Sequence, residues 1–325
     1  MLKKLALGTM SALILLSACS VKEDREETVS EAGEKTMTER IEPRELAEAL
    51  LEEQSEAIYQ QTSASFQAEI PFEDFEELLI SFNQGVTGYE LQSEVPIQSF
   101  THYTWIDKDE MKGIDVLFAE DGTIEQLFVL QLEAYSETDE QFTKTEFILP
   151  IQEEWFTFWG GTNELVNYHY ALESQRYAVD LLIMEEESTY EGDPAKNESY
   201  HAFGKEVIAP ADGVVIETEA TVADNEPVGE MNSEQPLGNY VLMEHEHGEY
   251  SVIAHLQQDS LHVSEGDEVR QGEVIGLSGN SGNSSEAHIH FQVNDSSDLE
   301  AGKSIRIRFK DQLTPIKGDY LQPQI

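Results

Sequence analysis

Residues 266–291 read GDEVRQGEVIGLSGNSGNSSEAHIHF. The stretch opens on a Gly-Asp pair that is typical of a turn, and it ends on the alternating run His288-Ile289-His290-Phe291. Alternate side chains of a strand share one face, so we expect His288 and His290 to point the same way while Ile289 and Phe291 enter a core. Two imidazoles on one face can place one on a metal ion and the other beside a substrate. Two solvent-exposed histidines would give the same pattern.

The sequence around this stretch is rich in predicted strands and turns. Short apolar runs bounded by Asp-Gly, His-Gly and Gly-Asp pairs predict strands at 178–184, 206–209, 213–217, 240–245 and 250–255. No long amphipathic helical pattern occurs here. We therefore expect residues 145–325 to form an all-β antiparallel domain.

Residues 43–136 have a different pattern. Pro43 is suited to the first turn of a helix, and apolar residues continue at helical spacing to Ile58. A second helical segment is expected over 72–82, and hairpin-forming strands over 100–132. Helices followed by antiparallel hairpins indicate an α+β domain. The segment resembles the small, cone-shaped, nuclear-transport-factor-2-like domains of bacterial lipoproteins, which implies a spacer or targeting module. A sugar or lipid pocket here is a further alternative.

The N-terminus has the features of an export signal. Lys3 and Lys4 precede an apolar run that ends at Leu16, too short to span a bilayer of ~30 Å. Leu16-Ser17-Ala18-Cys19 resembles the bacterial lipobox, which implies a signal peptide at 1–18 and a lipid anchor on Cys19. The alternative is an ordinary secretory signal with a chance cysteine. Residues 19–42 are polar and acidic, and we expect a flexible tether that holds the protein on the extracytoplasmic face of the cell membrane.

Charge and cysteine content exclude several classes of protein. The chain has 19 Lys and Arg against 65 Asp and Glu, a formal net charge of -46. Binding to nucleic acid, or to anionic lipid through a basic patch, requires basic faces that this composition does not supply. One cysteine cannot form an internal disulfide framework or a cysteine-rich zinc site. Eight of the nine histidines lie in the second half, so any metal would be held by imidazole and carboxylate, which suits Zn²⁺.

Several segments in order resemble the lysostaphin-type zinc endopeptidases of bacterial cell walls. The resemblance rests on Pro210-Ala211-Asp212-Gly213-Val214-Val215, Gly238-Asn239-Tyr240-Val241, Ala254-His255-Leu256, the spaced glycines and apolar residues of 266–276, and His288-Ile289-His290-Phe291. It implies a duplicated-hybrid-motif barrel or sandwich, a Zn²⁺ cofactor and peptidoglycan peptides as substrate. It also implies His290 as a zinc ligand, with His255 and His288 as catalytic residues beside the metal.

One departure from the family pattern concerns the first ligand. The family usually supplies His-x-x-x-Asp on one strand, but here Arg176 stands four residues before Asp180 and cannot ligate zinc. His169, eleven residues before Asp180, is the nearest upstream histidine, and the block from Asn167 to Asp180 resembles a variant subgroup. The expected ligands are thus His169, Asp180 and His290. The alternatives for the first position are the Gln175 amide, a second water, or a lost ligand.

The sequence therefore predicts a membrane-anchored zinc metalloendopeptidase that hydrolyses peptide bonds of peptidoglycan during cell-wall remodelling. The alternative is a catalytically inactive barrel that binds the wall or activates another hydrolase. A rival His-x-His, His245-Glu246-His247, precedes Gly248 and is expected at an exposed hairpin tip.

Overall fold

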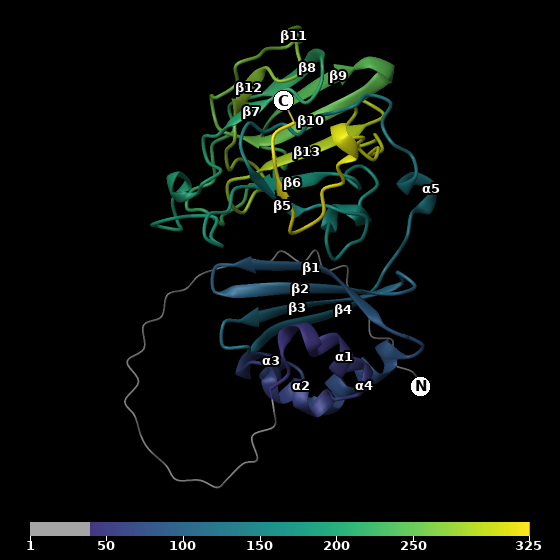
Figure 1. The fold of residues 1–325 in the computed structure, drawn as a ribbon. Helices are drawn as coiled ribbons and strands as arrows, with labels where there is room; N and C mark the ends of the chain where they lie inside the picture. Colours follow the sequence, from purple (N-terminus) through teal and green to yellow (C-terminus); the bar gives the residue numbers. More distant parts are fainter. Residues whose placement is uncertain (1–39, 325) are drawn as a thin grey trace. The chain divides into compact units, whose positions relative to one another are not determined.

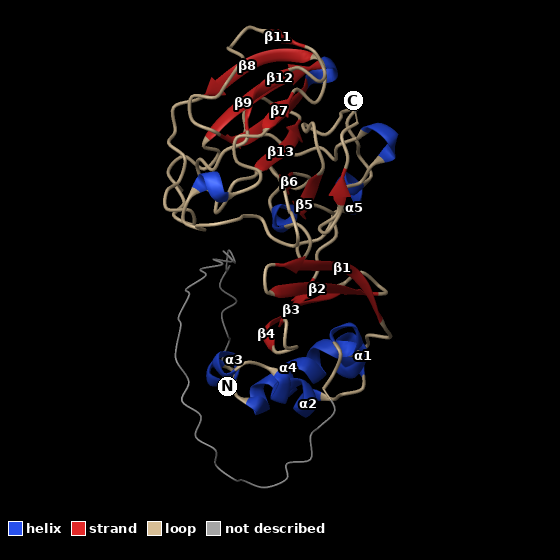
Figure 2. Ribbon diagram, turned by 60° about the vertical axis from the view of Figure 1, so that its left-hand side comes forward, coloured by secondary structure: helices blue, strands red, loops and turns tan. Residues whose placement is uncertain are grey.

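The structure is a computed structural model that describes residues 40–324. The predicted signal peptide, Cys19 and nearly all of the predicted tether lie outside the described residues. The described part falls within one compact unit by its internal contacts. It consists largely of antiparallel β-sheet with few helices, as Figures 1 and 2 show. No helix in the described range is long and apolar enough to cross a membrane.

The first part of the described chain combines short helices with a four-stranded antiparallel sheet of order β1-β2-β3-β4. Its elements are η1 (Pro43–Glu45), α1 (Leu46–Leu51), α2 (Ser55–Gln61), α3 (Ala64–Glu69), α4 (Phe72–Asn83), β1 (Tyr89–Ile97), β2 (Phe100–Asp107), β3 (Lys112–Ala119) and β4 (Ile124–Gln131). Helices and sheet share one apolar core that includes Leu46, Ile58 and Phe118. The expected hairpins over 100–132 are confirmed, whereas the nuclear-transport-factor-2-like assignment stays a prediction.

The helix expected to run from Pro43 to Ile58 is divided into two. Glu53 adopts a φ of 57°, a left-handed conformation that a continuing α-helix cannot contain. Leu50 before the break and Ile58 after it are 3% and 0% exposed. The break thus lets two short helices bury their apolar residues in the same core.

The second part contains an eight-stranded sheet of order β11-β8-β9-β10-β13-β6-β5-β14 and a two-stranded β12-β7 pair, all antiparallel. A short helix, α5 (Ser136–Asp139), precedes it. The strands are β5 (Trp155–Trp159), β6 (Val179–Leu182), β7 (Glu206–Ile208), β8 (Gly213–Glu219), β9 (Asn239–His245), β10 (Glu249–Leu256), β11 (Glu268–Val269), β12 (Val274–Leu277), β13 (Ile289–Asn294) and β14 (Tyr320–Leu321). The 3₁₀ turns are η2 (Tyr168–Ala171), η3 (Asn197–Ser199), η4 (Glu246–Gly248) and η5 (Lys310–Gln312).

Strand register brings distant residues of this sheet together. β13 lies between β10 and β6, and His290 pairs with Asp180 on one side and with Ala254 on the other. The register of β10 against β9 shifts after Ile253, and His255, within that shift, has a φ of 62°. Ile289 and Phe291 are fully buried, as the alternation predicts. Three neighbouring strands thus bring Asp180, His255 and His290 to one site.

Candidate active site

Three buried side chains offer ligand atoms to one point. His169 from η2, Asp180 from β6 and His290 from β13 present nitrogen or carboxylate oxygen atoms that all lie within 4.8 Å of one another. His290 Nδ1 is 2.9 Å from Asp180 Oδ1, and His169 Nε2 is 3.5 Å from Asp180 Oδ2. The structure therefore brings together the three residues that the sequence analysis named as ligands. His169 is among them although it lies outside β6, the strand that carries Asp180.

The remaining nitrogen of each of these two imidazoles is bonded to an amide oxygen. Asn167 Oδ1 lies 2.9 Å from His169 Nδ1, and Gln292 Oε1 lies 2.7 Å from His290 Nε2. An amide oxygen only accepts, so these contacts place protons on Nδ1 of His169 and Nε2 of His290. When the ring is neutral, the nitrogen that faces Asp180 keeps its lone pair and can ligate a metal. Acceptors that orient ligating imidazoles in this way are the usual second layer of a metal site.

Asn167 also fixes the turn that carries His169. Its side-chain amide donates to the backbone oxygen of Ala178 at 3.0 Å, two residues before Asp180. Asn167 is fully buried. The block around His169 in the sequence analysis includes Asn167, but Gln292 was missed there. The signal for Gln292 was present, because it follows His290 by two residues and so shares its face of β13.

Two further histidines lie beside the three. The ring of His255 is 4.7 Å from that of His288 and 6.0 Å from that of His290, and His288 Nε2 is 4.0 Å from Asp180 Oδ2. His255 Nδ1 contacts the backbone oxygen of Ser281 at 2.9 Å, and His288 Nδ1 contacts that of Glu286 at 2.8 Å. A carbonyl only accepts, so each Nδ1 carries a proton. In the neutral ring, Nε2 is then an available base.

The backbone at His255 is strained in a way that fits this role. Its φ of 62° is unusual for a residue with a side chain and lies in the irregular end of β10. Such outliers often lie at functional sites, where the surrounding structure holds them in place.

Burial and charge set the protonation states of the cluster. Burial lowers the pKa of His169 to about 3 and that of His255 well below its usual value. Burial alone would raise the pKa of Asp180, but the neighbouring histidines outweigh it and the pKa is lowered. Burial would likewise lower the pKa of His290, yet the hydrogen bond and charge of Asp180 raise it. The carboxylate is therefore ionised, and His169 and His255 are neutral, near pH 7.

The donor set fits a zinc ion. Two imidazole nitrogens and one carboxylate oxygen are the three protein ligands of many catalytic zinc sites, which keep a further position open. All three residues are at most 4% exposed, while the His288 side chain is 13% exposed. The fit rests on the converging, oriented ligand atoms.

Arg176, which replaces the ligand expected from the family pattern, is used elsewhere. Its guanidinium carbon lies 3.4 Å from the centre of the Tyr135 ring, and its Nε donates to the backbone oxygen of Tyr170 at 3.1 Å. Arg176 thus helps to hold the turn that carries His169.

The second His-x-His pair, His245 and His247, was predicted to be exposed, and only part of that prediction holds. His247 lies at the hairpin tip, with a φ of 69°, but His245 is only 5% exposed. Its Nδ1 contacts the backbone oxygen of Asp212 at 2.8 Å, and its Nε2 contacts Ser251 Oγ at 2.7 Å. The prediction of an exposed His245 is wrong because β9 continues to this residue and turns its side chain inward.

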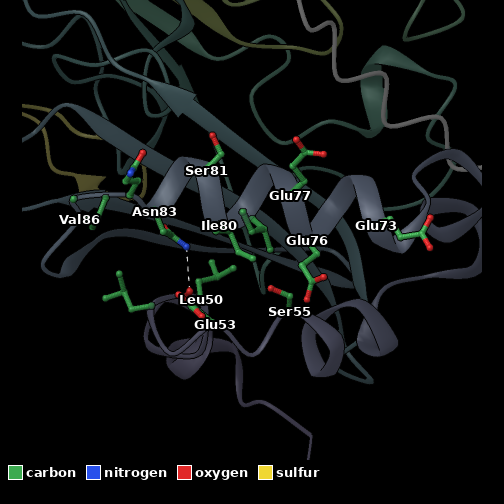
Figure 3. Close-up of a pocket in the computed structure, with 14 residues that line it drawn as sticks. Leu50, Glu53, Ser55, Glu73, Glu76, Glu77, Ile80, Ser81, Asn83 and Val86 are labelled. Atoms are coloured by element: carbon green, nitrogen blue, oxygen red, sulfur yellow. Dashed lines mark hydrogen bonds between the residues drawn. The ribbon is translucent and has the colours of Figure 1, made fainter.

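A separate groove of about 750 Å³ lies on α1, α2 and α4. Figure 3 shows glutamates along it, among them Glu73, Glu76 and Glu77, with Asn83 donating to the backbone oxygen of Leu50 at 3.0 Å. Within residues 40–324, no histidine lines this groove. The groove therefore offers no imidazole–carboxylate chemistry of the kind found on β13.

Several solved structures are similar to parts of this chain. Lysostaphin from Staphylococcus simulans is 23% identical, with 39% of this chain and 41% of that chain covered and a TM-score of 0.27. Pseudoalterin, an M23 metalloprotease from the deep sea, is 14% identical over 55% of this chain and 99% of that one, with a TM-score of 0.33. The SpoIIQ–SpoIIIAH pore-forming complex gives 18% identity over 66% and 89%, with a TM-score of 0.26.

The chain thus spans less than half of lysostaphin, and no curated relative matches it. The family comparison covers a stretch that contains His255, His288 and His290, and it begins after Asp180. Residues 199–304 match Peptidase family M23.

Proposed function

We propose that this protein is a zinc metalloendopeptidase that hydrolyses peptide bonds of bacterial peptidoglycan. The observation that carries the proposal is the convergence of His169, Asp180 and His290 within 4.8 Å, each imidazole oriented by an amide oxygen. The match of residues 199–304 to Peptidase family M23 supports the reaction class. Peptidoglycan as substrate follows from the resemblance to cell-wall peptidases.

The chain's own residues have distinct parts in the proposed reaction. His169, Asp180 and His290 would hold the zinc ion, which when bound supplies a Lewis acid and activates water for attack. His255 and His288, with Nδ1 bonded to backbone oxygens, each keep Nε2 as a proton acceptor. One of them can take the proton of the attacking water, and an imidazolium can return it to the leaving amine.

Digestion of purified peptidoglycan by the full chain tests the function. We expect new free amino groups to accumulate, to stop when a chelator is added, and to return when zinc is restored. Release of sugar reducing ends in place of amino groups would contradict a peptidase. Wall binding without cleavage would favour the alternative of an inactive, wall-binding barrel.

We expect His255→Ala and His288→Ala to reduce turnover while each variant keeps one zinc per chain. Neither residue belongs to the three-ligand cluster, and a general acid–base group typically contributes ~10²–10⁴-fold to the rate. Metal analysis beside the turnover number checks this. His201→Ala is the matched control, since His201 lies outside the cluster. If either variant loses its zinc, the division between ligands and catalytic residues is wrong.

Anchoring to the membrane is a further part of the proposal. Cys19 is the only cysteine and follows Leu16-Ser17-Ala18. Lipid chains contribute about 0.8 kcal/mol per buried CH₂, so two or more give stable anchoring. We expect Cys19→Ala to release the protein from membranes or to leave an unprocessed precursor. Incorporation of labelled palmitate that survives this substitution would contradict the anchor.

A further inference from the structure

An irregular segment joins two of the three proposed ligands, His169 in η2 and Asp180 on β6. His169 and Asp180 are separated by a turn that contains Tyr170, Arg176 and Tyr177. Ligands on one strand are held in place by the sheet, but a turn of this length is ordered only at a cost in chain entropy. Contacts that hold the turn therefore bear on the metal site.

A single carboxylate contacts both ends of this turn. Tyr170 Oη donates to Asp139 Oδ2 at 2.8 Å, and Tyr177 Oη donates to Asp139 Oδ1 at 2.8 Å. The two tyrosines are 0% and 6% exposed, and hydrogen bonds to an ionised acceptor are stronger than neutral ones. Tyr170 is adjacent to His169, and Tyr177 precedes Asp180 by three residues.

The short segment that carries Asp139 is itself bound to the turn. The backbone N–H of Tyr135 donates to Tyr170 Oη at 3.0 Å, and the Tyr135 ring receives the Arg176 guanidinium at 3.4 Å. Arg306 Nη1 donates to the backbone oxygen of Asp139 at 2.8 Å. We call residues 135–139, which include α5, the strap. The strap precedes the range 145–325 predicted for the peptidase domain.

We propose that Asp139 is a positioning residue for the metal site. Through the hydroxyls of Tyr170 and Tyr177 it holds the turn so that His169 and Asp180 face His290. The inference rests on the proposed zinc function, because its consequence is zinc affinity. On this proposal the strap helps to form the metal site, besides connecting the two parts of the chain.

The test compares zinc dissociation constants of full-length variants by competition with a chromogenic chelator. We expect Asp139→Ala to weaken zinc binding about tenfold or more, in the range found for residues that orient metal ligands. Glu137→Ala is the matched control, because Glu137 is an exposed acidic residue of the same helix α5, and it should bind zinc as the wild type does. Asp139→Asn, which keeps one acceptor oxygen, should fall between the two.

Variants of the two tyrosines test whether Asp139 affects zinc affinity through their hydroxyls. They also allow the proposal to be tested if Asp139→Ala does not fold. Tyr170→Phe with Tyr177→Phe retains both rings but removes both donors to Asp139, together with the contacts of these hydroxyls with Tyr135 and Thr138, so it should weaken zinc binding at least as much as Asp139→Ala does. Adding Asp139→Ala to that pair should cause no further loss, because the three groups act as one unit.

The outcomes separate the two proposals. Unchanged zinc affinity in folded Asp139→Ala, or in the tyrosine pair, would overturn the positioning role. A wild type that binds zinc tightly but cleaves no wall peptide would contradict the proposed function, while weaker binding in the Asp139 variant would still support the strap.

Discussion

His169→Ala is expected to lose zinc under conditions in which the wild type retains one ion per chain. The substitution removes one of three ligands and leaves Asp180 and His290, too few to hold zinc as three protein ligands do. Residues that only orient ligands change affinity by about 10–100-fold, and loss of a ligand should exceed that range. Metal analysis after gel filtration, beside turnover on peptidoglycan, measures both effects.

Gln175→Ala is the matched control for this result. Its amide was the alternative first ligand, but imidazole is the better zinc ligand, and His169 Nε2 is 3.5 Å from the Asp180 carboxylate. We expect Gln175→Ala to keep its zinc. Zinc retained by His169→Ala and lost by Gln175→Ala would reverse the assignment.

Asp115→Ala is expected to lower the free energy of unfolding by roughly 3 kcal/mol or more, because it leaves the charge of Lys317 buried without its partner. Lys317 Nζ lies 3.7 Å from Asp115 Oδ2, and the two side chains are 4% and 11% exposed. Thr104 Oγ1 also donates to Asp115 Oδ2 at 2.7 Å. Urea unfolding at neutral pH measures the loss. Asp109→Ala, at an exposed position in the same part of the chain, should change little. Equal stability of the two variants would contradict a structural ion pair.

The contribution of Asp115 should also depend on pH. Burial alone would raise its pKa, but the charge of Lys317, the neighbouring His102 ring and the hydrogen bond from Thr104 outweigh it and lower the pKa to about 2. Because the folded-state pKa lies below the ordinary value of 3.8, this stabilisation is complete above about pH 4 and is lost as the pH falls toward 2. The stability difference between wild type and Asp115→Asn should shrink over that window. A stability difference between the two proteins that grows on acidification would contradict a lowered pKa of Asp115.

Local periodicity predicted much of the sheet but not the details that depend on distant residues. The five expected strands are present, and Ile289 and Phe291 enter the core because side chains alternate along a strand. The burial of His245 was missed, because a His-x-His before a glycine looks the same at an exposed tip and at the end of a buried strand. The break between α1 and α2 was missed because apolar spacing continues through Glu53.

The candidate site was predictable to the extent that chemistry limits the choice of residues. Only imidazole and carboxylate were available as ligands, and His169 was the upstream histidine nearest to Asp180. Gln292 could have been found from strand periodicity. Asp139 could not, because its contacts with Tyr170 and Tyr177 join segments more than thirty residues apart and follow no local pattern.

The most direct test of the central claim is a crystal structure of the zinc-loaded full chain, with anomalous diffraction recorded at the zinc edge. We predict one zinc ion per chain, contacted by Nε2 of His169, a carboxylate oxygen of Asp180 and Nδ1 of His290, with His255 and His288 beside it but not bound. Zinc bound without His169, or at another place in the chain, would contradict the account.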